Sequence, residues 1–257
     1  MTLLAVTRLE LRRLFVRPLG WIIGALALAE LGWRFALLLQ FFLMNQVQLA
    51  SIPDGPGYTD IVIMPLLSSI ALPFALAELA LLIVPLLTMS SLASERAAGT
   101  LGLLYASGLS ATRIFIGKYL AVLVWLALWL ALALAIPVSM AQGAHLDWGK
   151  LAAATLGTFL TLAVLAAIGL ACSAFSQHPA ASAALALIVS VTLYCVNLGA
   201  QHAGVDSGFI NWLAMSTHQD NMMRGLVSSV DVSWFLLAIA VALALGIHRL
   251  ASDKERG

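Results

Sequence analysis

Six long apolar segments constrain the fold of this chain more than any other feature. A helix rises about 1.5 Å per residue, so it needs roughly 20 apolar residues to cross about 30 Å of hydrocarbon. The chain is 62% hydrophobic and 10% charged, whereas a soluble domain is about 25% charged. The sequence therefore predicts an all-α membrane protein with a single membrane domain over 1–257. The predicted spans are 19–44, 64–93, 114–140, 149–175, 180–200 and 232–251.

Residues 1–17 mix leucines with four arginines, which is typical of a short helix lying in the membrane interface. We expect no cleaved secretory signal, because the basic region reaches Arg17 and the following apolar run continues to Met44. That run is too long for the apolar core of a signal peptide.

The distribution of Lys and Arg predicts the orientation of the spans. If the N-terminus is cytoplasmic, the cytoplasmic segments hold ten of these residues, and the opposite side holds only Lys150 and Arg224. Positively charged loops are retained on the cytoplasmic side. We therefore expect both termini to be cytoplasmic.

The segment between the second and third spans contains two helix breaks. Gly99 can end one helix in a left-handed cap and Gly108 can end a second, with Thr100 and Ser110 as caps of the helices that follow. The apolar residues between the glycines are Leu101, Leu103, Leu104 and Tyr105. Such a helix has too little area to fold alone, so we expect it to pack on a partner protein. A plain interfacial turn is the alternative.

The run from Pro85 to Leu120, PLLTMSSLASERAAGTLGLLYASGLSATRIFIGKYL, resembles the signature of ABC-2 type permeases. Within that superfamily, PLLTM and STHQDNMMRGLVSSVDVSWFL (216–236) are similar to gliding-motility-type permeases. The resemblance implies that 1–17 is an elbow helix and that 95–108 is a coupling helix seated on a separate ATPase subunit. The residues it assigns to this coupling are Glu95, Arg96, Gly99, Thr100, Leu101, Leu104, Tyr105 and Gly108. Ser94 and Gly102 depart from the family pattern, which has an acid at each position.

The partners implied by the resemblance are two copies of an ABC ATPase subunit, a second copy of this chain, membrane lipids and an extracytoplasmic accessory protein, in a bacterial inner membrane. No nucleic acid is expected. The chain has no phosphate-binding loop, because Tyr119 follows Gly117-Lys118 where Ser or Thr is needed. We therefore expect no enzymatic site and no cofactor on this chain, with ATP and Mg on the partner ATPase.

Three charged residues fall well inside the predicted spans, away from their ends, where charge is costly: Glu30, Arg34 and Glu78. Glu30 and Arg34 are four residues apart, so they share one helix face and can neutralise each other. A structural ion pair is one interpretation. The other is that Glu78 contacts the polar group of a substrate or forms a three-charge network with the first two.

The longest outside connection, 201–231, has the composition of amphipathic or re-entrant helices. By family likeness it forms an outer gate, and an aromatic belt anchored by Trp212 is the alternative. The gate residues are Phe209, Trp212, Met215, Met222, Met223 and Arg224.

No metal site is expected. His202 with Asp206, and His218 with Asp220, fall short of the three or four converging ligands that zinc needs, so solvated loop histidines are the better interpretation. Cys172 and Cys195 lie inside apolar runs, which disfavours a disulfide framework.

Three functions fit these features to different degrees. The first is a permease subunit of an ATP-driven transporter that exports a lipid, a polysaccharide or another amphipathic substrate. The second is a non-transporting membrane anchor or mechanotransmission subunit that uses the same ATPase dock. The third, an intramembrane enzyme, lacks support because the spans contain no H-E-x-x-H motif and no paired aspartates.

Overall fold

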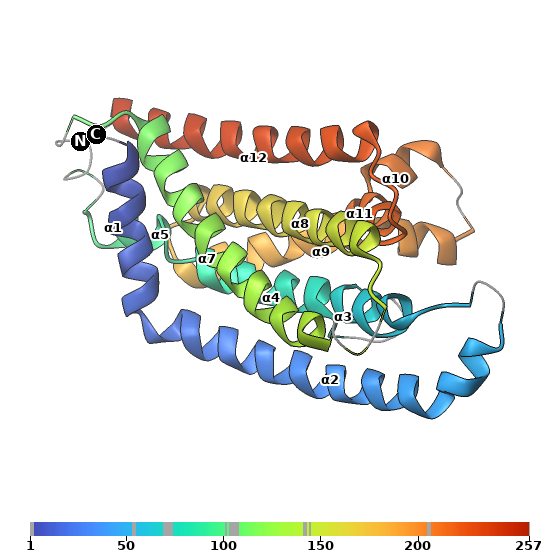
Figure 1. Cartoon of the computed structure of the whole chain (residues 1–257). Coiled ribbons are helices and arrows are strands. Elements are labelled where there is room, and N and C mark those ends of the chain that lie inside the picture. Colours follow the sequence, from blue (N-terminus) through green and yellow to red (C-terminus); the bar gives the residue numbers. More distant parts are fainter. Residues whose placement is uncertain are drawn as a thin grey trace.

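The computed structural model describes residues 3–52, 55–68, 74–100, 102, 108–140, 143, 145–204 and 207–256, and every regular element among them is a helix (Figure 1). Six of the helical segments are long and apolar enough to cross a membrane, which confirms the predicted fold class. These segments are Pro18–Leu49, Leu76–Ala97, Ala111–Ser139, Trp148–Phe175, Pro179–His202 and Ser229–Asp253.

The helices follow one another along the chain with short connections. In order they are α1 (Leu3–Val16), α2 (Pro18–Ala50), η1 (Thr59–Ile63), α3 (Met64–Leu67), α4 (Leu76–Thr88), α5 (Ala93–Ala97), α7 (Ala111–Ser139), α8 (Trp148–Phe175), α9 (Pro179–His202), α10 (Gly208–Leu213), α11 (Met215–Met223) and α12 (Ser229–Arg256).

Local sequence accounts for where the long helices begin. Pro18 and Pro179 open α2 and α9, because proline has no N–H to lose in the first turn and its fixed φ suits a helix. Ser110 and Asp147 cap α7 and α8, since each side chain accepts a hydrogen bond from the backbone N–H three residues later.

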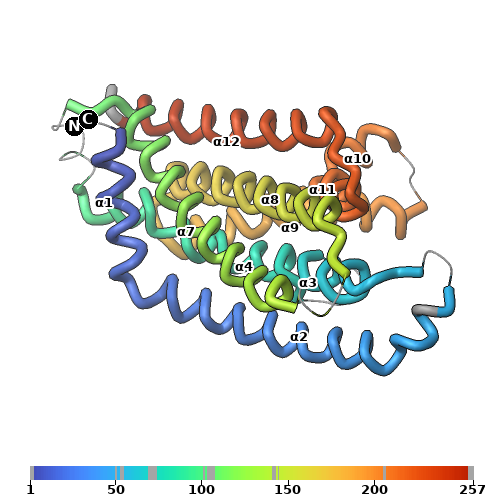
Figure 2. The backbone as a smooth tube through the Cα atoms, viewed as in Figure 1, coloured from blue at the N-terminus to red at the C-terminus, as the bar shows by residue number. Residues whose placement is uncertain are grey.

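The start of α1 and the end of α12 lie at the same end of the bundle, which we call the terminal end; the opposite end is the distal end (Figure 1). There α1 runs crosswise to the long helices. In the tube view α8 lies between α12 and α4 (Figure 2), and it contacts both of them as well as α7, α9 and α11. Helix α8 is therefore the centre of the fold.

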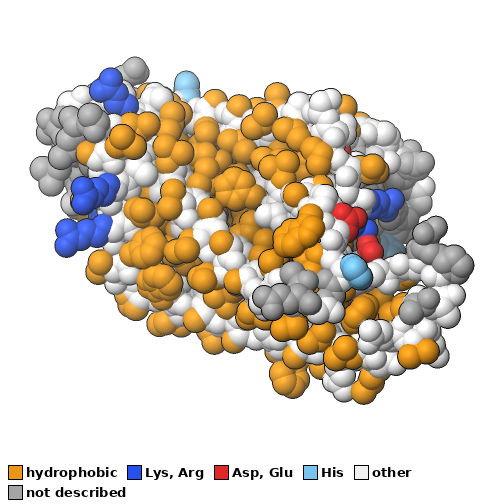
Figure 3. Space-filling view, in the orientation of Figure 1, with side chains coloured by type: hydrophobic (Ala, Val, Ile, Leu, Met, Phe, Trp, Pro, Cys, Tyr) orange, Lys and Arg blue, Asp and Glu red, His pale blue; other side chains and the backbone are white. Residues whose placement is uncertain are grey.

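Burial separates the central helix from the peripheral ones. The most apolar stretch of α8 is 78% buried, whereas those of α2, α9 and α12 are 28%, 17% and 28% buried. The space-filling view shows apolar side chains over the middle of the molecule and basic side chains at the terminal end (Figure 3). An exposed apolar belt of this kind suits contact with lipid, and the chain is an integral membrane protein.

The predicted second span, 64–93, is wrong as one continuous helix. Helix α3 ends at Leu67, Ser68 is extended, Phe74 has a φ of 70°, and α4 begins only at Leu76. A proline at position 73 disfavours helical backbone at the residue before it, which explains an interruption here. The membrane-spanning helix instead runs from Leu76 to Ala97.

The short helices η1 and α3 are fixed to the distal ends of two spans. The hydroxyl of Tyr58 donates to the carbonyl oxygen of Pro137 at 2.9 Å, and burial raises the pKa of Tyr58 to about 12. Lys150, at the start of α8, forms an ion pair with Asp60 of η1. These contacts hold η1 against α7 and α8.

Candidate functional site

A buried lysine organises the terminal end. Lys118, on α7, is 2% exposed. Its Nζ donates to Glu10 Oε1 at 2.8 Å, to Glu95 Oε1 at 2.9 Å and to the carbonyl oxygen of Ser91 at 2.9 Å. An ammonium group has three donors, so all three are used. This one side chain joins α1, α7 and the segment that leads into α5.

Arg13 adds a second cation to the same two carboxylates. Its Nη1 lies 2.7 Å from Glu95 Oε1 and 3.1 Å from Glu10 Oε1. The hydrogen bond to Glu95 raises the pKa of Arg13, against the lowering effect of its partial burial. Glu10, Arg13, Glu95 and Lys118, which we call the terminal charge cluster, therefore hold two negative and two positive charges.

Close packing fixes α1 on α7 beside this cluster. A Cβ atom added at Gly117 would lie 2.8 Å from Cγ1 of Val6, so only glycine permits the approach. Arg17, just after α1, donates to the hydroxyl of Ser90 at 2.9 Å. The N-terminal helix is thus attached both to α7 and to the chain that follows α4.

Arg96 points to different partners from its neighbour Glu95. It forms an ion pair with Asp253 of α12, and its Nη1 donates to the carbonyl oxygen of Ser176 at 3.3 Å. Arg249 Nη2 lies 3.4 Å from the other oxygen of Asp253. Two consecutive residues of α5 therefore connect it to α1 and α7 on one side and to α8 and α12 on the other.

Helix α5 is also held at its start by α8. The hydroxyl of Ser173 accepts hydrogen bonds from the backbone N–H groups of Leu92 and Ala93, each at 3.0 Å, and donates to the carbonyl oxygen of Met89 at 3.1 Å. Helix N-termini leave such N–H groups without intrahelical partners. A buried side chain from the central helix satisfies two of them.

The glycine cap predicted at Gly99 is present. Gly99 has a φ of 68°, its N–H bonds to the carbonyl of Arg96, and the N–H of Thr100 bonds to the carbonyl of Glu95. This pair of bonds is a Schellman cap, which uses glycine in the left-handed conformation. Gly108 has a φ of 73°. The residues expected to contact the ATPase between these glycines, Leu101, Leu104 and Tyr105, lie outside the described residues.

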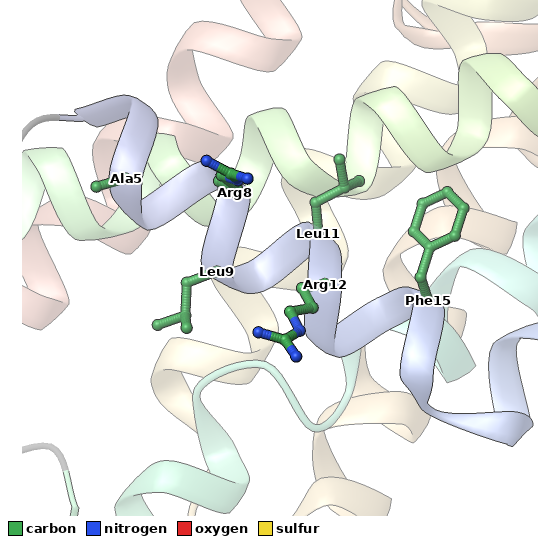
Figure 4. Close-up of a pocket in the computed structure, with 6 residues that line it drawn as sticks. All are labelled: Ala5, Arg8, Leu9, Leu11, Arg12 and Phe15. Carbon is green, nitrogen blue, oxygen red and sulfur yellow. The ribbon is translucent and has the colours of Figure 1, made fainter.

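The exposed side of α1 forms a surface hollow of about 680 Å³ (Figure 4). Leu9 and Arg12 extend to the same side of the helix in this view. The residues that line the hollow are Ala5, Arg8, Leu9, Leu11, Arg12 and Phe15. Exposed arginines among apolar side chains suit contact with lipid headgroups and the upper acyl chains together.

The three predicted intramembrane charges come together in the structure. Arg34 is 7% exposed on α2, and its guanidinium is attracted by the charges of Glu78 and of Glu30. Glu78, in the first turn of α4, accepts a hydrogen bond from the hydroxyl of Tyr194 at 3.3 Å. That hydroxyl lies 3.2 Å from the hydroxyl of Ser68. Side chains of α2, α4 and α9 thus meet beside the interruption between α3 and α4.

A groove of about 600 Å³ opens beside these charges. Glu30, on its wall, is exposed, whereas Arg34 is buried. The side chains that line it are Glu30, Trp33, Arg34, Leu37, Leu38 and Phe41 of α2, with Ile61 of η1 and Pro65 of α3. The groove is therefore apolar apart from two charged residues.

At the distal end, His218 is buried, so its interpretation as a solvated loop histidine is wrong. Its Nδ1 lies 2.6 Å from Asp231 Oδ1, and its ring stacks on Trp234 with centroids 4.9 Å apart. Asn221 also donates to Asp231. Among the described residues no group of three His, Cys, Asp or Glu side chains could hold a metal ion.

The predicted gate residues divide into two groups. Met215, Met222 and Met223 are buried, and a Cβ atom added at Gly157 of α8 would lie 2.8 Å from Cβ of Met222. The exposed group is Phe209, Trp212 and Arg224. Helix α11 therefore packs closely on the central helix, and α10 presents aromatic side chains at the surface.

Comparison with protein families decides the class of the chain. Residues 45–247 match the family described as ABC-2 family transporter protein. The chain belongs to this ABC-2 transporter family. No curated protein matches it. Membership makes the chain a membrane component of a transport system. The matched residues include Glu78, the connector from Gly99 to Gly108, and the distal helices α10 and α11, whereas Glu30 and Arg34 precede them.

Sequence reasoning missed several residues of these sites: Glu10, Lys118, Tyr194 and Asp231. Two of them carried a usable signal. Lys118 is a charge inside a predicted span, and Glu10 is the one acid within the basic segment 1–17. A buried lysine needs a negative partner, and Glu10 offers one on the same side of the membrane.

Proposed function

We propose that this ABC-2 chain is the permease subunit of an ATP-driven transporter that exports amphipathic molecules. A separate ATPase docks on the connector between Gly99 and Gly108, and two copies of each subunit form the working unit. The terminal end faces the cytoplasm, which is supported by the basic side chains gathered there. Residues 1–17 then act as the elbow helix.

The observation that carries this proposal is the anchoring of α5. Glu95 and Arg96 connect the base of the connector to α1, α7, α8 and α12 through ion pairs and hydrogen bonds. A segment attached to several spans can transmit a displacement to all of them, because packed elements move as units. Force applied by an ATPase at the connector is therefore passed to the membrane helices.

The groove on α2 favours transport over a purely mechanical role. A charged residue exposed inside the bilayer is costly and usually serves a pathway or a binding site. Glu30 is such a residue, and it lies in a groove of about 600 Å³. A membrane anchor without cargo has no need of this arrangement.

Purification of the tagged chain from its own host membranes tests the proposal. We expect an ATPase to co-purify in a two-plus-two complex. The double variant Leu104→Asp/Tyr105→Asp should abolish co-purification, because it places charge on the docking surface. Leu226→Asp, at an exposed distal position, is the matched control and should leave the complex intact. A complex that survives the double variant would refute docking on the connector.

A further inference from the structure

The position of Glu30 on α2 is unusual for an acidic residue. It lies twelve residues after Pro18, so it is about 18 Å along a helix that spans the bilayer. Its side chain is exposed on the surface of the chain. A carboxylate facing hydrocarbon is costly. Something other than lipid tails must therefore face this residue.

The charges around Glu30 do not balance. Arg34 is attracted by both Glu78 and Glu30, so one guanidinium serves two carboxylates. A positively charged ligand beside Glu30 would supply a second cation to these two carboxylates. Its attraction to them is strong in a medium of low dielectric constant.

The lining of the groove also suits the apolar part of a ligand. Its charged residues, Glu30 and Arg34, lie toward one end along α2, and the apolar residues from Leu37 to Phe41 lie toward the other. Trp33, beside Glu30, is 67% exposed and presents an aromatic ring. Aromatic rings attract cations through their electron-rich faces.

We propose that the α2 groove binds an amphipathic cation, with Glu30 as its counter-ion and Trp33 and the neighbouring apolar side chains around its apolar body. The assignment of such cations as cargo rests on the proposed function. Binding itself does not, because it requires neither ATP nor an ATPase.

Two ions of the same shape and opposite charge test the site. The purified chain in lipid nanodiscs is titrated with radiolabelled tetraphenylphosphonium, a cation, and with tetraphenylborate, an anion. We expect saturable binding of the cation alone. Glu30→Gln should weaken that binding at least about tenfold, whereas Glu30→Asp should retain most of it. Asp220→Asn removes the same charge from α11, outside the groove, and should leave binding unchanged.

Equal binding of both ions, or unchanged cation binding in Glu30→Gln, would overturn the inference. A cross-linking experiment gives a third test, in which Trp33→Cys is introduced into a Cys172→Ala/Cys195→Ala background. Formation of a disulfide between two such chains would also overturn the inference. That disulfide would show that a second copy covers this face. If the cation binds as expected but no ATP-dependent transport is found in the complex, the proposed function fails and the binding site stands.

Discussion

Nδ1 of His218 lies 2.6 Å from Oδ1 of Asp231, at a site where both side chains are buried. The other ring nitrogen, Nε2, lies 2.9 Å from the carbonyl oxygen of Trp212. Both ring nitrogens of His218 therefore have a hydrogen-bond partner, which a buried polar side chain needs. Through these two contacts His218, on α11, joins α10 and α12.

We predict that Asp231→Leu destabilises the protein by about 1–3 kcal/mol, because it leaves Nδ1 of the buried His218 and the amide of Asn221 without their hydrogen-bond partner. Thermal unfolding in detergent measures the effect. The double variant His218→Phe/Asp231→Leu should recover much of the loss, since apolar residues of similar shape can replace a buried hydrogen-bonded pair. An unchanged unfolding temperature in Asp231→Leu would show that this contact does not stabilise the fold.

Lys118→Met should also lower stability by about 3–5 kcal/mol, because Glu10 and Glu95 would keep only Arg13 as a counter-charge. The same unfolding assay applies. Arg113→Met is the control, as Arg113 lies on α7 but is exposed. Equal effects of the two variants would contradict the role given to the terminal charge cluster.

Gly246→Ala should destabilise the protein by about 1–3 kcal/mol, since the added Cβ atom would overlap the ring of Phe115 on α7. Phe115→Leu in the same chain should relieve part of this cost. Gly32→Ala is the matched control, because nothing lies within 4 Å of a Cβ atom added there. A similar loss at both glycines would mean that the helix backbone, rather than the ring, sets the cost.

Burial raises the pKa of Asp220 above its ordinary value of 3.8, and the charge of Arg224 offsets part of this effect. The folded state therefore holds the proton more tightly than the unfolded state. Its contribution to stability is fully present below the ordinary pKa and is lost as pH rises through the raised one. Asp220→Asn should thus stabilise the protein at about pH 7, with the gain shrinking toward about pH 4. Unfolding temperatures measured across this range check the trend; a constant difference would contradict it.

Glu78→Gln should impair transport and leave assembly with the ATPase intact. The variant removes the charge that attracts Arg34 while keeping an oxygen that can accept from Tyr194. We expect at least about tenfold slower transport, which corresponds to about 1.4 kcal/mol. Transport of a fluorescent amphipath by reconstituted complex measures the rate, and co-purification of the ATPase is the control. Unchanged transport would show that the charge of Glu78 plays no part in the transport pathway.

The length of the apolar runs predicts six helices long enough to cross a membrane, and the position of Gly99 predicts the cap of α5, because both depend on local physics. The interruption between Leu67 and Leu76 was missed, since the surrounding residues are as apolar as a continuous span. The partners of charged residues were missed for a different reason. Lys118 and Glu10 are 108 residues apart in the chain. Only the packing of α1 on α7 brings them together.

The terminal charge cluster also imposes an order on synthesis. Glu10, Arg13 and Glu95 all precede Lys118 in the chain, so a ribosome completes both acids and one base before the lysine. Until α7 is made, the terminal charge cluster lacks Lys118. The ion pairs of Lys118 with Glu10 and Glu95 can therefore form only after the third span has been made, so the docking of α1 on α7 is completed late in the synthesis of the chain.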